Sequence, residues 1–175
     1  MTRRILPTFL VALAAAGMTA GCDTSERPAE LSLDDVQACS LISRPRLVSL
    51  DVTTRPMPDP LVPGSGLEGS TCFYNTRHGA TAIVSLVTND GIDYWTDSKS
   101  TKTVDLPPIQ GYRTIQLDPD HSSDPHDRCT LAVDVADGQS LRADTGPNDS
   151  DQPPSCEVSR QFAESAVASL ALQAR

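Results

Sequence analysis

The chain has 175 residues, a formal net charge of −9 and an aromatic content of only 4%. Because so acidic a surface is repelled by phosphates, we expect no nucleic-acid partner and no adhesion to anionic headgroups by charge. The length favours one domain whose core consists mostly of aliphatic side chains.

The first 21 residues have the pattern of an export signal that ends at a cysteine. Arg3 and Arg4 precede an apolar run over 5–16, which is too short to span a bilayer, and small residues lead up to Cys22. The pattern predicts a lipoprotein signal peptide over 1–21, with diacylglyceryl and acyl groups on Cys22. We therefore expect a lipid-anchored protein on the extracytoplasmic face of the cell membrane. A plain secretory signal with a chance cysteine is the alternative.

After the signal we expect a short polar tether over 22–30 and a single domain over 31–172. Ser32 followed by Asp35 resembles a capping box and predicts a first helix, with a second short helix before residue 51. The segment 51–69 contains four prolines and three glycines, which indicates a long loop.

Apolar segments in the rest of the domain predict strands, a short helix over 91–98 and one final helix. Asp137-Gly138 is a strong hairpin signal, and apolar side chains spaced four apart over 155–170 predict the helix. Hairpin-linked strands with helices at the ends indicate an α+β fold, a mostly antiparallel sheet of about five strands with flanking helices. The predicted strands are 71–76, 80–88, 112–117, 129–135 and 140–145, with a further short segment over 104–106.

Four cysteines remain besides Cys22, an even set that indicates two disulfides in an exported protein. Three pairings are possible, and the sequence alone does not choose among them. We favour Cys39 with Cys72 and Cys129 with Cys156; each loop then spans about 30 residues, and its closure stabilises the fold by roughly 3–4 kcal/mol. Zinc binding is the competing interpretation, but the chain has no C-x-x-C pair.

No motif predicts catalysis or a cofactor. G-x-S-x-G, S-x-x-K and H-E-x-x-H are absent, and the G-x-G-x-x-G match at 64–69 follows a proline-rich loop instead of a strand. Asp118, Asp120 and Asp124 alternate like the start of a calcium loop, but the glycine and glutamate that an EF-hand requires are missing. These three residues are weak metal candidates, and a solvated acidic loop is the default interpretation.

The cysteine contexts resemble a known family. Ala-Cys-Ser-Leu-Ile surrounds Cys39 in the first predicted helix, and Thr-Cys-Phe-Tyr surrounds Cys72 at a strand start. Arg-Cys-Thr-Leu surrounds Cys129 at a later strand start, and Ser-Cys opens the last helix at Cys156. This order, behind a lipoprotein signal, resembles the actinobacterial lipoproteins built on the domain of unknown function 3558 (DUF3558).

The resemblance to this family covers about residues 31–170 of the chain. It implies the sequential disulfide pairing and a sheet-and-helix domain like that of the photosystem assembly protein PsbP. It implies no reaction, because none is established for the family.

We expect a protein that acts by binding and not by catalysis. Our first hypothesis is an accessory protein of the cell envelope that contacts an unknown envelope protein, for example through 51–69. A small-ligand or lipid carrier is the alternative, and it requires an apolar cavity between sheet and helices. A hydrolase is less favoured because it rests on no motif. Tyr94 and Trp95 are assigned to core packing.

Overall fold

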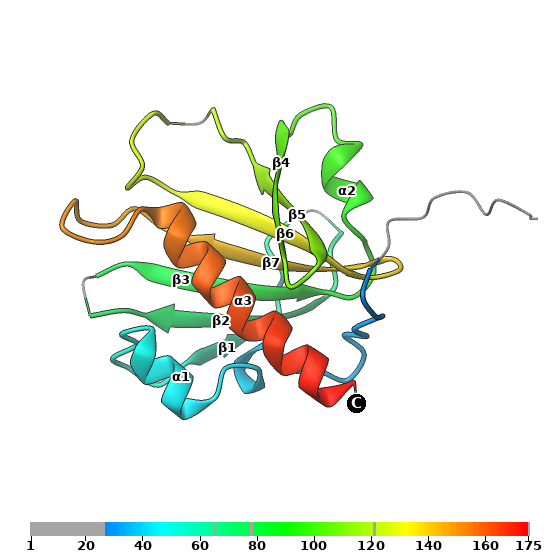
Figure 1. The fold of residues 1–175 in the computed structure, drawn as a ribbon, viewed down its shortest axis with the longest axis horizontal. Coiled ribbons are helices and arrows are strands. Elements are labelled where there is room, and N and C mark those ends of the chain that lie inside the picture. The colour runs from blue at the N-terminus through cyan, green and yellow to red at the C-terminus, as the bar shows by residue number, and fades with distance from the viewer. Residues whose placement is uncertain (1–26, 65, 78, 121, 175) are drawn as a thin grey trace, which may run out of the picture.

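The computed structural model describes residues 27–64, 66–77, 79–120 and 122–174; the predicted signal peptide, Cys22 and most of the tether lie outside them. The domain is a seven-stranded antiparallel sheet in the order β1-β2-β3-β7-β6-β5-β4, with one long helix, α3, across one face (Figure 1). The α+β class and the antiparallel sheet are confirmed, whereas the predicted count of about five strands is wrong. The elements are η1 (Ala38–Ser40), α1 (Arg44–Ser49), β1 (Met57–Asp59), β2 (Gly69–Asn75), β3 (Thr81–Val87), α2 (Asp93–Thr96), β4 (Thr103–Ile109), β5 (Tyr112–Leu117), β6 (Cys129–Ala136), β7 (Gln139–Thr145) and α3 (Ser155–Gln173).

The sequence hides one edge strand of the sheet, β1, and most of the other, β4, of which only the short segment 104–106 is predicted. β1 lies inside 51–69, the segment predicted to be a loop, and contains Pro58. β4 continues through Pro107 and Pro108, where its pairing with β5 shifts register. Proline lacks an N–H donor, so a strand tolerates it only at an edge or a bulge. A pattern dominated by proline therefore conceals both edges.

The first helix is much shorter than its sequence predicts. Only η1 forms, a single 3-10 turn, and Asp35 has a left-handed φ of 62°. The Ser32 hydroxyl donates to the carboxylate of Asp34 instead, at 3.0 Å. The predicted capping box is therefore wrong, whereas the second and last helices form where expected as α1 and α3.

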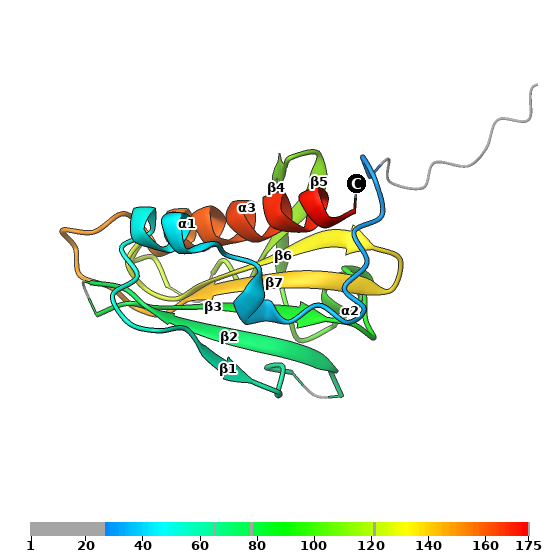
Figure 2. The same cartoon turned by 90° about the horizontal axis from the view of Figure 1, so that it is seen from below.

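The larger part of the core lies between the sheet and α3. Figure 2 shows α1 and α3 together on this side of the sheet. Alternate side chains of the central strands, such as Val84 and Ala143, are fully buried here, as are Phe162 and Ala166 of α3. Side chains from the sheet, η1 and α3 join in one buried cluster. Packed aliphatic and aromatic groups thus occupy the space in which a lipid carrier would need a cavity.

Tyr74 connects three parts of this core. Its ring lies 5.2 Å from the ring of Phe162, measured between centroids, and its hydroxyl donates to the Ala38 carbonyl at 3.2 Å. Burial raises the pKa of Tyr74 far above its ordinary value, so the hydroxyl stays protonated and able to donate. One side chain therefore links β2, α3 and η1.

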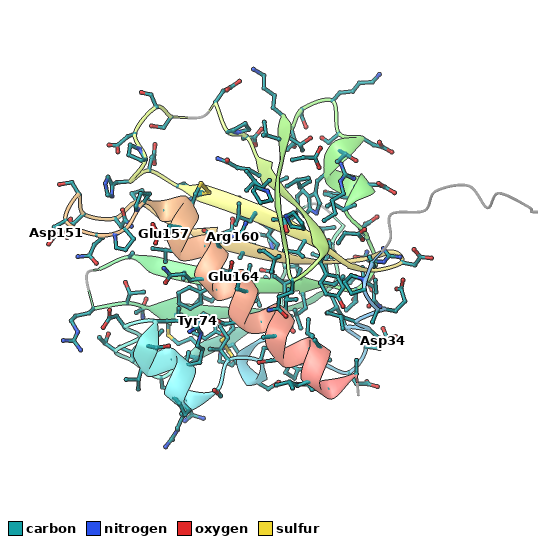
Figure 3. All side chains as sticks on the ribbon, viewed as in Figure 1. Asp34, Tyr74, Asp151, Glu157, Arg160 and Glu164 are labelled. Carbon is teal, nitrogen blue, oxygen red and sulfur yellow. A yellow bond between two sulfur atoms is a disulfide. The ribbon has the colours of Figure 1, made fainter. Side chains whose placement is uncertain are left out.

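Two disulfides attach helical elements to this face of the sheet. Cys39–Cys72 joins η1 to β2, and Cys129–Cys156 joins β6 to α3 (Figure 3). The predicted sequential pairing is confirmed. Each bridge holds a peripheral element against a strand that the core already buries.

The first described residues are fixed to the β6–β7 hairpin. Arg27 forms ion pairs with Glu30 at 2.7 Å, Asp134 at 2.7 Å and Asp137 at 2.6 Å. The Leu31 N–H donates to the carbonyl of β6 residue Val135 at 2.9 Å. The chain therefore enters the domain at the β6–β7 hairpin end of the sheet (Figure 1).

Within the described ranges, no helix combines the length and the hydropathy that crossing a bilayer requires. The longest helix, α3, carries a buried stripe on one side only, which packs on the sheet.

Removing one disulfide should measure its contribution to stability. In a Cys22→Ser background, which cannot be lipidated, replacing Cys129 and Cys156 together with serine should lower the free energy of unfolding by about 3–4 kcal/mol, because the bridge spans 27 residues and restricts the unfolded chain. Urea denaturation measures the loss, with the Cys22→Ser chain as control. An unchanged midpoint would contradict the assignment, as would a peptide map linking Cys39 to Cys129.

Candidate functional site

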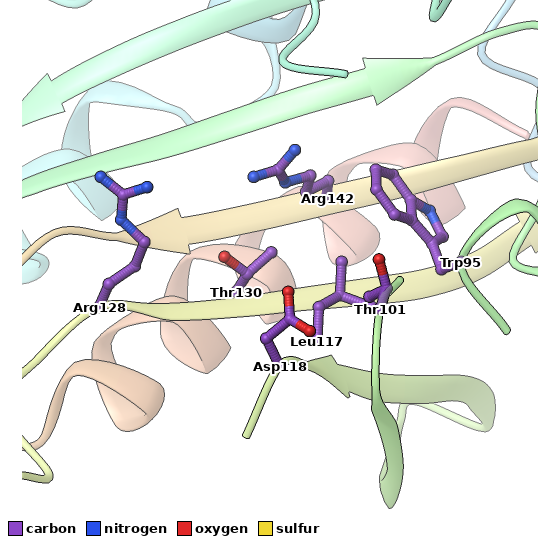
Figure 4. A pocket seen from close by; sticks show the side chains of 7 residues that line it. All are labelled: Trp95, Thr101, Leu117, Asp118, Arg128, Thr130 and Arg142. Atoms are coloured by element: carbon purple, nitrogen blue, oxygen red, sulfur yellow. The ribbon is translucent and has the colours of Figure 1, made fainter. Parts of the chain in front are cut away.

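A pocket of about 280 Å³ opens on the face of the sheet opposite α3 (Figure 4). Its base is formed by neighbouring strands β5, β6 and β7, and its sides come from α2, the segment before β4 and the β5–β6 loop. The residues that line it are Trp95, Thr101, Leu117, Asp118, Arg128, Thr130 and Arg142.

Because side chains alternate along β7, one face of this strand is apolar and the other carries charged side chains. Leu141 and Ala143 are fully buried in the core on the α3 side, so Arg142 and Asp144 project to the pocket side. The register pairs Asp144 with Thr130 of β6. A central strand therefore carries two charged side chains on a face that is largely covered.

Arg142 and Asp144 form a buried ion pair. Arg142 Nη2 donates to Asp144 Oδ1 at 2.6 Å, and the two side chains are 15% and 7% exposed. The Thr130 hydroxyl donates to the same oxygen at 2.6 Å. Asp144 Oδ2 and Arg142 Nε are buried and have no hydrogen-bond partner among the described residues. The polar atoms of this pair are thus only partly hydrogen-bonded, and an unpaired buried polar atom lowers stability in a low-dielectric environment.

Arg142 also connects the sheet to the elements that cover it. Its Nη1 donates to the Pro63 carbonyl in the loop before β2, at 2.7 Å. Its guanidinium carbon lies 5.4 Å from the centre of the Trp95 ring, within range of a cation–π contact. Trp95 Nε1 in turn donates to Ser140 of β7 at 3.4 Å. One side chain therefore holds both the loop and α2 against this face.

Trp95 has two roles. It packs in the second hydrophobic cluster, between α2 and the sheet, which confirms its assignment to core packing. It also lines the pocket, a role that its sequence context does not indicate. The other members of this cluster are Val62, Val87, Ile92, Ile115, Leu117 and Ala132, with Leu67 and Tyr94 packed against them.

The exposed part of the pocket carries one cation and one anion. The Arg128 side chain forms no hydrogen bond or ion pair with the described residues; only its backbone N–H is engaged, by Asp127. Asp118 Oδ1 accepts a hydrogen bond from the Lys102 N–H at 3.0 Å. Arg128 and Asp118 both line the pocket and do not form an ion pair with each other. The pocket therefore offers two separate, opposite charges to a ligand.

The three weak metal candidates do not converge on one point. Asp120 pairs with Lys102 Nζ at 2.7 Å, which raises the pKa of Lys102. Asp124 accepts from the His126 N–H at 2.9 Å, and Asp118 accepts from a different backbone group. No group of three or more histidine, cysteine or acidic side chains that could hold a metal occurs in the described part of the chain.

His126 is the one histidine among the described residues, and its recorded side-chain partner is an amide. It lies in the β5–β6 loop, where its Nδ1 is 3.0 Å from Asn148 Oδ1. His78 and His121, the other two histidines, lie outside the described residues.

Sequence reasoning missed most of the residues that line the pocket. Arg128, Thr130 and Arg142 were not singled out, although 129–135 and 140–145 were correctly predicted as strands. The available signal was the alternation of apolar side chains with Arg142 and Asp144 in a strand that follows a tight hairpin. Charged residues at every second position mark the face of such a strand that lies away from the main core.

The buried ion pair should depend on both partners. Asp144→Ala should lower the free energy of unfolding by about 3 kcal/mol, because it leaves the Arg142 guanidinium buried without its carboxylate. The double variant Arg142→Met, Asp144→Ala should lose less than Asp144→Ala alone, since no charge is then left buried. Denaturant titrations compare the two. A double variant less stable than either single variant would contradict this account.

Comparisons with known proteins give one family and no individual relative. Neither a curated protein nor a solved structure matches the chain significantly. The profile of a family described as "Protein of unknown function (DUF3558)" matches residues 14–169. This range contains both disulfides, every helix and strand except the last turn of α3, and the whole pocket. The chain therefore belongs to the DUF3558 family.

Proposed function

We propose that this protein is a non-catalytic binding protein of the cell envelope, anchored to the extracytoplasmic face of the membrane by lipid on Cys22. Its recognition site is the pocket opposite α3. The family resemblance extends the proposal to a PsbP-like arrangement of the sheet and helices. No cofactor is part of the proposal.

The composition of the pocket is the observation that supports the proposed binding role. It combines an indole, Trp95, with an arginine that has no partner among the described residues, Arg128, and an acidic side chain, Asp118. Small-molecule sites characteristically pair an apolar wall with a few polar groups that fix orientation. A volume of about 280 Å³ suits a small ligand and is too small for the acyl chains of a lipid.

The attachment of the first described residues to the β6–β7 hairpin supports the proposed lipid anchor. Arg27 lies five positions after Cys22, so the hairpin end would lie within roughly 18 Å of a lipidated Cys22. Arg27 holds that point in place through three ion pairs. The loops at the other end of the sheet, 118–128 and 146–154, would then face away from the membrane (Figure 1).

Contact with an envelope protein is the second candidate function. The edge strand β1 lies in 51–69, the segment expected to make such a contact. Two apolar side chains of this segment are well exposed, Met57 of β1 at 50% and the nearby Leu61 at 73%. An exposed edge strand offers unpaired backbone groups to a partner strand.

Native mass spectrometry tests the binding role directly. The protein is extracted from its own membrane in mild detergent and transferred intact to the gas phase. We expect one small polar molecule to accompany each chain, because the pocket volume of about 280 Å³ suits a ligand of that size. A co-purifying phospholipid, or a stoichiometric protein partner without a small adduct, would contradict the small-ligand role.

The same preparation tests the anchor. The wild-type chain should partition into detergent, and Cys22→Ser should remain in the aqueous phase, because the acidic domain does not adhere to the membrane by charge. Aqueous behaviour of the wild-type chain would contradict lipid attachment.

A further inference from the structure

We propose that the pocket binds a small zwitterion, a molecule that carries a carboxylate and an ammonium group beside a compact apolar body, as a free α-amino acid does. This inference rests on the proposed function, because it names the ligand class of the same site.

The carboxylate would be held by Arg128. Of the two arginines that line the pocket, Arg142 already pairs with Asp144, whereas Arg128 has no partner among the described residues. The guanidinium fork matches a carboxylate in two parallel hydrogen bonds. Arg128 lies at the start of β6, and its side chain extends beside the pocket with the guanidinium on the same side of the sheet as that of Arg142 (Figure 4).

The ammonium group would be held by Asp118. This residue follows β5, and its side chain points toward the pocket from the side opposite the arginines (Figure 4). Its Oδ1 accepts a backbone hydrogen bond from Lys102, which fixes the orientation of the carboxylate. Its other oxygen is free of any hydrogen bond with the described residues. The carboxylate is therefore held in position, and the Lys102 ammonium interacts with it electrostatically without a hydrogen bond to it.

The apolar body would lie against Trp95 and Leu117. Each is about 7% exposed, and both line the pocket. The hydroxyl of Thr130 is occupied by Asp144, whereas Asp144 Oδ2 and Arg142 Nε have no hydrogen-bond partner among the described residues. The limited volume restricts this body to a few carbon atoms.

The charge balance explains why one charge on the ligand is insufficient. The Arg142–Asp144 pair is internally neutral, and Arg128 and Asp118 carry one charge each. Arg128 and Asp118 are both exposed, so a ligand with only a carboxylate pairs with Arg128 alone, and a ligand with only an amine pairs with Asp118 alone. A ligand with both groups forms two charge-assisted contacts in place of one, so the site favours a molecule that carries both.

A fluorescence titration tests this selection, because Trp95 is the only tryptophan in the chain. The twenty standard amino acids are added singly to the Cys22→Ser chain, with calorimetry to confirm any response. The tightest binder is compared with two analogues, one lacking its amine and one lacking its carboxylate. For leucine these are 4-methylpentanoate and 3-methylbutylamine. We expect saturable binding and at least a tenfold loss of affinity for each analogue.

Charge-removing variants identify the contacts. Arg128→Gln and Asp118→Asn should each weaken binding at least tenfold. Asparagine keeps the acceptor for the Lys102 N–H and tolerates the left-handed φ of 47° at position 118, so only charge is lost. The matched controls are Arg113→Gln and Asp105→Asn, which remove an exposed ion pair outside the pocket. Both controls should leave the affinity unchanged.

The outcomes separate this inference from the proposed function. If no amino acid binds, or if an analogue with one charge binds as tightly as its parent, the zwitterion proposal is wrong. Undiminished affinity in Arg128→Gln would also overturn it. A small adduct in native mass spectrometry would still support a binding role in these cases, whereas absence of any adduct would remove the proposed function itself.

Discussion

The Arg142–Asp144 ion pair organises the face of the sheet that α3 leaves open. Asp144 is held by Thr130 of the neighbouring strand, and Arg142 reaches the Pro63 carbonyl and the ring of Trp95. A buried pair of this kind contributes little net stability compared with apolar side chains of the same size. Its value here is positional, because it fixes the loop before β2 and α2 over the strands. The pocket lies beside the loop and α2, where these elements no longer cover the sheet.

The two faces of the sheet therefore have different roles. On the α3 side, aliphatic packing and two disulfides produce a filled core in which Tyr74 and Phe162 are almost fully buried. On the other side, a smaller apolar cluster borders charged residues that lack complete hydrogen bonding. Functional sites commonly retain such incomplete polar networks, because a stable scaffold elsewhere compensates for them. The rigid face supports the face that carries the pocket.

The sequence predicts the parts of this fold that depend on local patterns. Period-two alternation and the Asp137-Gly138 turn locate the central strands, and apolar spacing locates α3. The edges escape detection because prolines at positions 58, 107 and 108 are tolerated only when a strand has a free side, a property of the assembled sheet. The pocket could not be predicted from the sequence for a similar reason. Arg142 and Trp95 are 47 positions apart, and only the strand order and the placement of α2 bring them together.

The central claim is that Arg142 holds Trp95 and the loop before β2 against the sheet. Tryptophan emission and acrylamide quenching measure this directly, because the chain contains a single tryptophan. In Arg142→Met, with the fold checked by circular dichroism, we predict red-shifted emission and a quenching constant at least doubled relative to wild type. Arg113→Met, on β5 and separated from β7 by β6, serves as control. Unchanged emission and quenching in Arg142→Met would contradict the account.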